Sequence, residues 1–110
     1  MVARSASDVA RQDDFDEILT TTVAMLEKAQ LGSWSEVQRL ASVRQHLLQA
    51  FFSVTPDPRE TPYLAAGIKR LLDLNACLTG LGEAERDRIA GRMSELRTRQ
   101  RAQRAYGGGL

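Results

Sequence analysis

The chain has 110 residues, a length typical of one domain, and its 43% hydrophobic and 26% charged residues are ordinary for a soluble globular protein. The chain has only one cysteine, Cys77, so an intrachain disulfide is excluded. It also has only one histidine, so too few ligands are present for a typical metal site. The net charge of +1 hides an asymmetry: residues 1–30 hold three bases and six acids, whereas residues 83–110 hold seven bases and four acids.

No apolar run approaches the ~20 residues that span a bilayer, and the N-terminus lacks the apolar segment of a secretory signal. We therefore expect a cytoplasmic protein without membrane insertion, metal or cofactor.

A first helix is predicted over residues 8–31, after a disordered segment at residues 1–7. Its apolar positions recur at steps of three and four, which places them on one helical face. They are Phe15, Ile18, Leu19, Thr22, Met25, Leu26 and Ala29. Gly32 then supplies the stop.

A second helix is predicted over residues 33–54. Ser33 and Glu36 match the capping box S-x-x-E, in which each side chain binds the other residue's amide. Arg44 falls in the apolar stripe where an apolar residue is expected. Pro56 and Pro58 follow the helix and end it.

A third helix is predicted over residues 62–104, with Thr61 as N-cap and Pro62 in the first turn. Apolar spacing near 3.5 survives Gly80 and Gly82, which favours one long helix; the alternative is a break there, with a short fourth helix beginning at Glu83. A flexible tail is expected at residues 105–110. The fold prediction is all-α: an antiparallel three-helix bundle, one domain over residues 8–104, whose long third helix extends to a basic C-terminal end.

The second and third helices carry more apolar residues than one core face needs. Adjacent Phe51 and Phe52 point about 100° apart on a helix, so either both are in the core or one lies on a protein interface. Asn75 interrupts the apolar seam of the third helix, where a buried hydrogen bond would fix register. The excess indicates protein binding rather than catalysis.

The C-terminal arginines allow three interpretations. A solvated helix end favoured by the helix dipole and an acidic protein surface are the stronger two. Nucleic-acid binding is the weakest, since no aromatic residues interleave with the arginines, and we predict none. Nothing in the sequence points to an enzyme: it has no phosphate-binding glycine motif, and Glu83, Glu85 and Asp87 alternate with arginines as on a salt-bridged surface.

Several motifs together resemble the flagellar export chaperones of the FliT type. They are Ala29-x-x-Gly32-x-Trp34, Arg44 followed by Leu47-Leu48 and Phe51-Phe52, Ile68-x-x-Leu71-Leu72-x-x-Asn75, Arg86-Asp87-x-Ile89-x-x-x-Met93-x-x-Leu96, and Ala105-Tyr106-Gly107. They extend from about Phe15 to Gly107.

The resemblance implies a cytoplasmic helical protein without enzymatic activity. It would bind the C-terminal segment of the filament-cap protein, prevent premature assembly, and deliver that cargo to the export ATPase complex and export gate of the type III machinery. The candidate cargo-binding residues are Phe51, Phe52, Ile68, Leu72, Leu74 and Leu78. The candidate residues for docking to the export apparatus are Tyr106, Arg101 and Arg104. The alternative is a generic helical adaptor or dimerisation module without a flagellar role, and self-association into a homodimer is left open.

Overall fold

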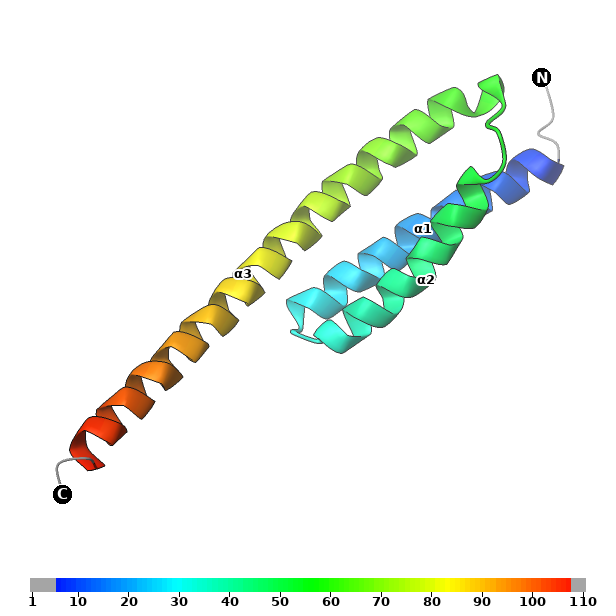
Figure 1. Cartoon of the computed structure of the whole chain (residues 1–110). Coiled ribbons are helices and arrows are strands. Elements are labelled where there is room, and N and C mark those ends of the chain that lie inside the picture. The colour runs from blue at the N-terminus through cyan, green and yellow to red at the C-terminus, as the bar shows by residue number, and fades with distance from the viewer. Residues whose placement is uncertain (1–5, 108–110) are drawn as a thin grey trace. The chain divides into compact units, whose positions relative to one another are not determined.

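The structure, a computed structural model, describes the backbone of residues 6–107 and the side chains of residues 10–107 (Figure 1). Its elements are α1 (Ala6–Gln30), α2 (Trp34–Phe52), the short 3-10 helix η1 (Pro58–Glu60) and α3 (Thr61–Gly107). No strand occurs within residues 6–107, so the predicted all-α fold with three helices is confirmed.

The chain divides into two compact units. The N-terminal unit, Met1–Thr79, holds α1, α2, η1 and the first part of α3, and the C-terminal unit, Gly80–Leu110, holds the rest of α3. Helical conformation continues through Gly80 and Gly82, and no separate fourth helix begins at Glu83.

The observed helix bounds differ from the predicted ones. The helix α1 begins earlier than predicted and α3 ends later, whereas α2, at Trp34–Phe52, is shorter than the predicted 33–54. The segment expected to be disordered lies mostly outside the described residues, and its last two residues, Ala6 and Ser7, are helical. The expected flexible tail begins with Ala105 and Tyr106, yet α3 includes both and ends at Gly107; residues 108–110 lie outside the description. Alanine favours helix, and nothing before Gly107 stops the helix.

Gly32 ends α1 as predicted, with φ at +75°. Its amide donates to the carbonyl of Ala29 at 3.0 Å, and the amide of Ser33 donates to that of Lys28 at 2.9 Å, the paired bonds of a Schellman motif.

The predicted capping box at Ser33 is wrong, because this motif already uses the Ser33 amide that the Glu36 side chain would need. Ser33 makes no side-chain capping bond, and the Glu36 carboxylate accepts from Arg39 at 3.0 Å instead.

Thr61 is not the N-cap of α3, which corrects a second local prediction. Asp57 accepts from the amide of Arg59 at 2.9 Å and thereby caps η1. The amide of Thr61 then donates to the carbonyl of Pro58, so that Thr61 is already helical, at φ −51° and ψ −49°.

The core of the N-terminal unit forms where the three helices meet. Its buried cluster consists of Phe15, Ile18, Phe51, Leu64 and Leu71. The ring of Phe15 meets that of Phe51 edge-on at 5.3 Å between centroids. Gly67 lets α3 approach this ring, since a Cβ atom there would overlap Phe15.

Arg44, Asn75 and Thr22 form a polar cluster that joins all three helices. Arg44 Nη1 donates to Asn75 Oδ1 at 2.6 Å and to Thr22 Oγ1 at 3.3 Å, and Thr22 donates to the carbonyl of Ile18. Burial lowers the pKa of Arg44, and within residues 10–107 no carboxylate pairs with it. Arg44, which interrupts the apolar stripe of α2, is thus the hydrogen-bond partner of Asn75, which interrupts the apolar seam of α3.

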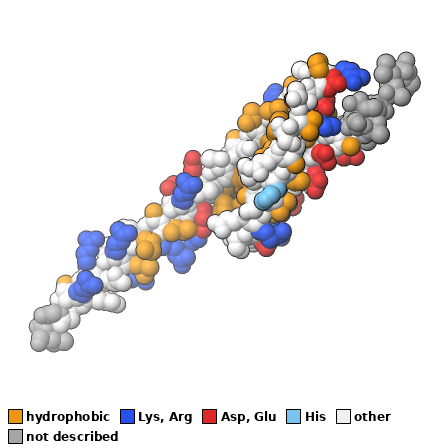
Figure 2. All heavy atoms as spheres, turned by 45° about the vertical axis from the view of Figure 1, so that its right-hand side comes forward, with side chains coloured by type: hydrophobic (Ala, Val, Ile, Leu, Met, Phe, Trp, Pro, Cys, Tyr) orange, Lys and Arg blue, Asp and Glu red, His pale blue; other side chains and the backbone are white. Residues whose placement is uncertain are grey.

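The C-terminal unit contains a single helical segment, and none of its described residues, 80–107, is buried. Its large apolar side chains Ile89, Met93 and Leu96 are each about half exposed. Arg88 donates to Glu85 at 2.6 Å, one turn away. Basic side chains, all of them arginines, gather toward the C-terminal end of α3, with hydrophobic side chains between them (Figure 2).

Candidate protein-binding surface

Phe51 and Phe52 have different environments, although they are adjacent. Phe51 is 3% exposed and belongs to the core, whereas Phe52 is 49% exposed. The two rings meet edge-on at 5.0 Å between centroids. Of the two interpretations of this pair, the structure therefore agrees with the one in which one phenylalanine lies outside the core. Phe51 is buried, so only Phe52 is kept among the proposed cargo-binding residues.

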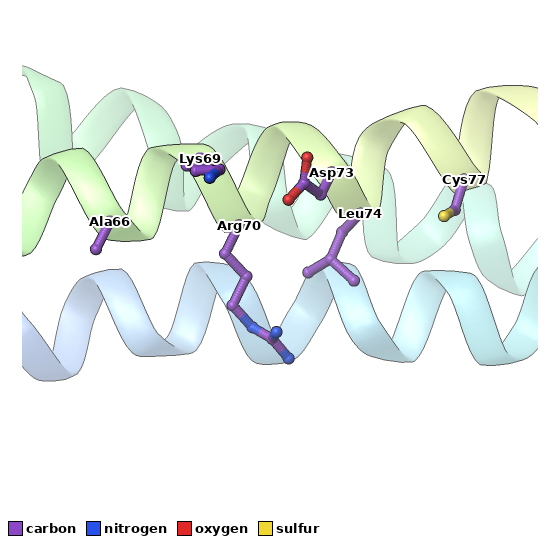
Figure 3. A pocket seen from close by; sticks show the side chains of 6 residues that line it. All are labelled: Ala66, Lys69, Arg70, Asp73, Leu74 and Cys77. Atoms are coloured by element: carbon purple, nitrogen blue, oxygen red, sulfur yellow. The ribbon is translucent and has the colours of Figure 1, made fainter.

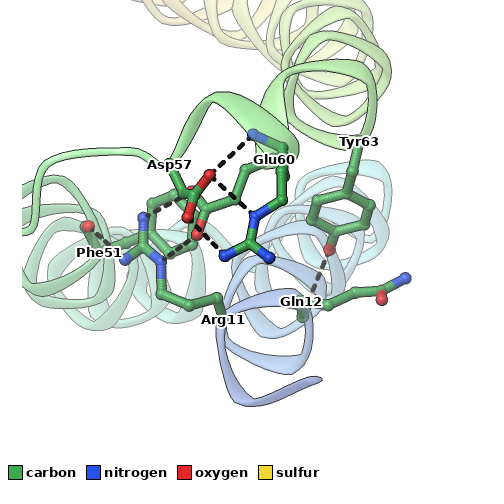
Figure 4. Close-up of polar contacts among 7 residues, drawn as sticks. Arg11, Gln12, Phe51, Asp57, Glu60 and Tyr63 are labelled. Atoms are coloured by element: carbon green, nitrogen blue, oxygen red, sulfur yellow. Dashed lines mark hydrogen bonds and ion pairs between the residues drawn. The ribbon is translucent and has the colours of Figure 1, made fainter. Parts of the chain in front are cut away.

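Arg11 fixes the end of α2 that carries both rings (Figure 4). Its guanidinium donates to the carbonyl of Phe51 at 2.8 Å and to the carboxylate of Glu60 at 3.1 Å, and lies 3.9 Å from the centroid of the Phe51 ring. Nearby, the hydroxyl of Tyr63 donates to the carbonyl of Gln12 at 2.7 Å. These contacts tie α1 to both ends of the α2–α3 connection.

The side of α3 that faces α2 is identified by Asn75, which binds Arg44 of α2. Ile68 lies seven residues before Asn75 and Leu72 three before it, so both share that side of the helix. They are 37% and 62% exposed, respectively. This edge of α3 thus carries two accessible apolar side chains beside α2.

Leu48 and Phe52 follow Arg44 along α2 at steps of four, and therefore lie on the side from which Arg44 reaches α3. Because α2 and α3 run in opposite directions (Figure 1), residues after Arg44 lie level with residues before Asn75. Phe52 thereby comes close to the level of Ile68. We name Leu48, Phe52, Ile68 and Leu72 the α2–α3 apolar surface; Leu48 is half-buried and packs on the core.

Leu74 and Leu78 do not lie on this surface. Leu74 is seven residues after Gly67, which packs on Phe15, so Leu74 faces α1. Leu78 continues the buried seam of Leu64 and Leu71 at steps of seven. Both are half-buried, so the six candidate cargo residues do not form one face.

A shallow hollow lies along α3 beside Leu74 (Figure 3). Arg70 and Leu74 point from α3 toward α1 in this view. The lining residues are Ala66, Lys69, Arg70, Asp73, Leu74 and Cys77. Three of the six lining residues are charged, and both charge signs occur among them, which suits a solvated edge rather than a site for an apolar cargo side chain.

The candidate docking residues Arg101, Arg104 and Tyr106 are all exposed, and Tyr106 is 86% exposed. Within the described residues, no group of three or more His, Cys, Asp or Glu could hold a metal ion. No described helix is long and apolar enough to cross a membrane.

The described chain is thus a small helical bundle that leaves an apolar surface between two helices open. A family model described as flagellar protein FliT matches residues 12–108, so the chain belongs to the FliT family and is a flagellar export chaperone. This is a family of chaperones, not of enzymes. No curated protein and no solved structure matches the chain.

Sequence reasoning did not identify the roles of four residues in this part of the bundle: Leu48, Gly67, Arg11 and Glu60. Leu48 could have been found from its four-residue spacing to Phe52, and Gly67 from its place on the seam between Leu64 and Leu71. The pairing of Arg11 with Glu60 had no local pattern, because 49 residues separate them.

Proposed function

We propose that this chaperone binds the C-terminal segment of the filament-cap protein in the cytoplasm, prevents its premature assembly and delivers it to the export machinery. The α2–α3 apolar surface supports the proposal: a bundle that buries Phe15, Ile18 and Phe51 completely or nearly so still leaves Phe52, Ile68 and Leu72 accessible. Contiguous accessible apolar side chains mark sites for protein partners.

The arrangement suits an amphipathic helix as cargo. Ile68 and Leu72 lie one helical turn apart on α3, and Leu48 and Phe52 lie one turn apart on the facing edge of α2. Two parallel rows of apolar side chains are the usual receptor for the apolar face of a bound helix. In this proposal Phe52, Ile68 and Leu72 contact the cargo, Leu48 lies beneath it, and Leu74 and Leu78 support the bundle.

Calorimetric titration of the purified protein with the C-terminal segment of the filament-cap protein tests the proposal. We expect Phe52→Glu and Leu72→Glu each to weaken binding by about tenfold or more, because each places a charge against an apolar partner. Val43→Glu is a matched control, since Val43 is 42% exposed on α2 but lies nine residues before Phe52, on the opposite side. Absence of binding by the wild-type protein would contradict the proposed cargo.

Docking to the export ATPase complex and export gate is proposed for Tyr106, Arg101 and Arg104. These side chains lie in the last turns of α3, away in sequence from the cargo-binding residues, and are accessible to a partner. We expect Tyr106→Ala to reduce secretion of the filament-cap protein without changing cargo affinity, with Gln103→Ala as a control. Equal loss of secretion in both variants would argue against a specific role for Tyr106.

The alternative of a generic adaptor without a flagellar role is disfavoured by the family match over residues 12–108.

A further inference from the structure

Arg44 occupies a position on α2 where a positive charge is unfavourable. Val37 and Phe51, seven residues before and after it, are 8% and 3% exposed. A step of seven residues returns to nearly the same side of a helix, so Arg44 lies on the face of α2 that packs on the core. The side chain is half-buried, and this burial lowers its pKa. A charge held away from water in this way needs an opposite charge to compensate it.

The bundle compensates the charge of Arg11 but not that of Arg44. Arg11 is half-buried as well, and its guanidinium pairs with the carboxylate of Glu60 at 3.1 Å. Arg44 instead donates from Nη1 to two neutral oxygens, Asn75 Oδ1 and Thr22 Oγ1. It takes part in none of the ion pairs found within residues 10–107. In this part of the chain the charge of Arg44 is therefore left without an opposite charge.

Two nitrogens of the Arg44 guanidinium are available to a partner. Nε and Nη2 make no hydrogen bond within residues 10–107. Since no buried side-chain nitrogen or oxygen of the described residues lacks a hydrogen-bond partner, both atoms reach solvent. Thr22 of α1, which accepts from Nη1, is fully buried, and α1 packs closely on α2. A partner therefore reaches the guanidinium from the side between α2 and α3.

These nitrogens lie at one end of the α2–α3 apolar surface. Arg44 precedes Leu48 by one helical turn on α2, and Asn75 follows Leu72 by three residues on α3. At 1.5 Å per residue, Arg44 lies about 12 Å along α2 from Phe52. A bound helix of about three turns that covers Phe52 and Leu48 therefore also reaches Arg44, and displaces water from its guanidinium.

We propose that Arg44 binds a carboxylate of the cargo and so adds a polar requirement to an otherwise apolar recognition surface. The pair forms only if the cargo helix lies on the α2–α3 apolar surface, so it rests on the proposed function. A partner that covers Arg44 without supplying an acceptor leaves a buried unpaired charge, which disfavours the complex. A carboxylate compensates that charge and accepts from Nε and Nη2 side by side, the arrangement that a guanidinium favours.

The positions of these residues define the class of cargo that fits. Arg44 is four residues from Leu48 and eight from Phe52. On a cargo helix packed along α2, the acidic residue therefore lies about one turn beyond the residue level with Leu48 and about two turns beyond the residue level with Phe52. The ligand is thus an amphipathic helix with a carboxylate at one end of its apolar face. That carboxylate belongs either to an Asp or Glu side chain or to the end of the cargo chain.

Calorimetric titration with the C-terminal segment of the filament-cap protein tests the chaperone side of this pair. Arg44→Met with Asn75→Leu replaces both polar partners by apolar groups, which should keep the bundle folded, as circular dichroism checks. We expect this double variant to bind the segment about tenfold or more weakly than the wild-type protein. Arg39→Gln removes an exposed arginine of α2 and should leave the affinity unchanged. Equal or tighter binding by the double variant overturns the inference, whereas a wild-type protein that does not bind the segment overturns the proposed function itself.

A scan of the cargo tests the other side of the pair without altering the chaperone. Each Asp and Glu of the segment is changed in turn to Asn or Gln, and one further peptide carries an amidated C-terminus, which separates a side-chain carboxylate from the chain end. We expect one of these peptides to bind the wild-type protein about tenfold more weakly. The same peptide should bind the double variant as the unchanged segment does, because that variant has already lost the pair. If no peptide is weakened, or if the weakening persists in full against the double variant, no carboxylate of the cargo meets Arg44 and the inference is overturned.

Discussion

Leu64 and Leu71 lie in the first part of α3 and are 8% and 9% exposed, whereas Ile89 and Leu96, in the C-terminal unit, are each 50% exposed. Both pairs are spaced seven residues apart, so both mark one face of a helix. The first pair is buried because α1 and α2 supply Phe15, Ile18 and Phe51 to cover it. The spacing of apolar residues thus indicates which face of a helix is apolar. It does not indicate whether another helix covers that face. The following predictions probe this difference.

The largest expected effect is at the core. Phe51→Ala should lower the free energy of unfolding by about 3–5 kcal/mol, because it leaves a cavity beside Phe15 and removes the ring under Arg11. Ile89→Ala should cost less than about 1 kcal/mol, since its side chain is half exposed in the free chain. Urea denaturation of dilute protein measures the free energy of unfolding of both variants. Equal losses would show that the buried and the exposed apolar side chains contribute equally to stability.

Loss of the polar cluster should have the next largest effect. Arg44→Ala removes the donor to Asn75 Oδ1 and Thr22 Oγ1 and should destabilise the N-terminal unit by about 1–3 kcal/mol. The double variant Arg44→Met with Asn75→Leu should recover much of this, because both polar partners are replaced by apolar groups. Thermal unfolding of the two variants and of Arg39→Ala, an exposed control arginine, checks the expectation.

Glycine-to-alanine substitutions should have opposite signs in the two regions. Gly67→Ala should destabilise by about 1–3 kcal/mol, because its Cβ atom would overlap the Phe15 ring. Gly91→Ala should increase helix stability by about 1 kcal/mol or less, since a Cβ atom there meets nothing within 4 Å. Circular dichroism during denaturation separates the two cases, and a tolerated Gly67→Ala would contradict the close approach of α3 to α1.

The smallest effect concerns Glu85 in the C-terminal unit. The hydrogen bond from Arg88 lowers the pKa of Glu85 below its ordinary value. Because the folded-state pKa is lowered, the small stabilisation is present above the ordinary glutamate pKa and is lost as the pH falls through the lowered value. Carboxyl titration by NMR should therefore show a low midpoint for Glu85 that rises in Arg88→Gln, with Arg86→Gln as control. A midpoint unchanged in Arg88→Gln would show that this pair does not persist in solution.

The sequence by itself determined the three α-helices, the stop at Gly32 and the phase of each apolar stripe. It favoured a continuous third helix but left a break at Gly80 and Gly82 open, and the structure shows the helix continuing through both. The helices, the stop and the stripes follow from spacing and backbone preference within a few residues, which the order of residues states directly. The resemblance to FliT chaperones likewise rested on the order and spacing of local motifs, and the family match over residues 12–108 confirms it.

Only the tertiary structure decided that Phe51 is core and Phe52 is surface, that Arg44 binds Asn75, and that Leu74 faces away from the α2–α3 apolar surface. Each depends on which helix lies beside which face, and neighbours in space can be 31 residues apart, as Arg44 and Asn75 are. The failed capping box has the same cause on a smaller scale. The Ser33 amide has one proton to donate, and it donates this proton to the carbonyl of Lys28 at the end of α1. It is therefore not available to the Glu36 side chain at the start of α2.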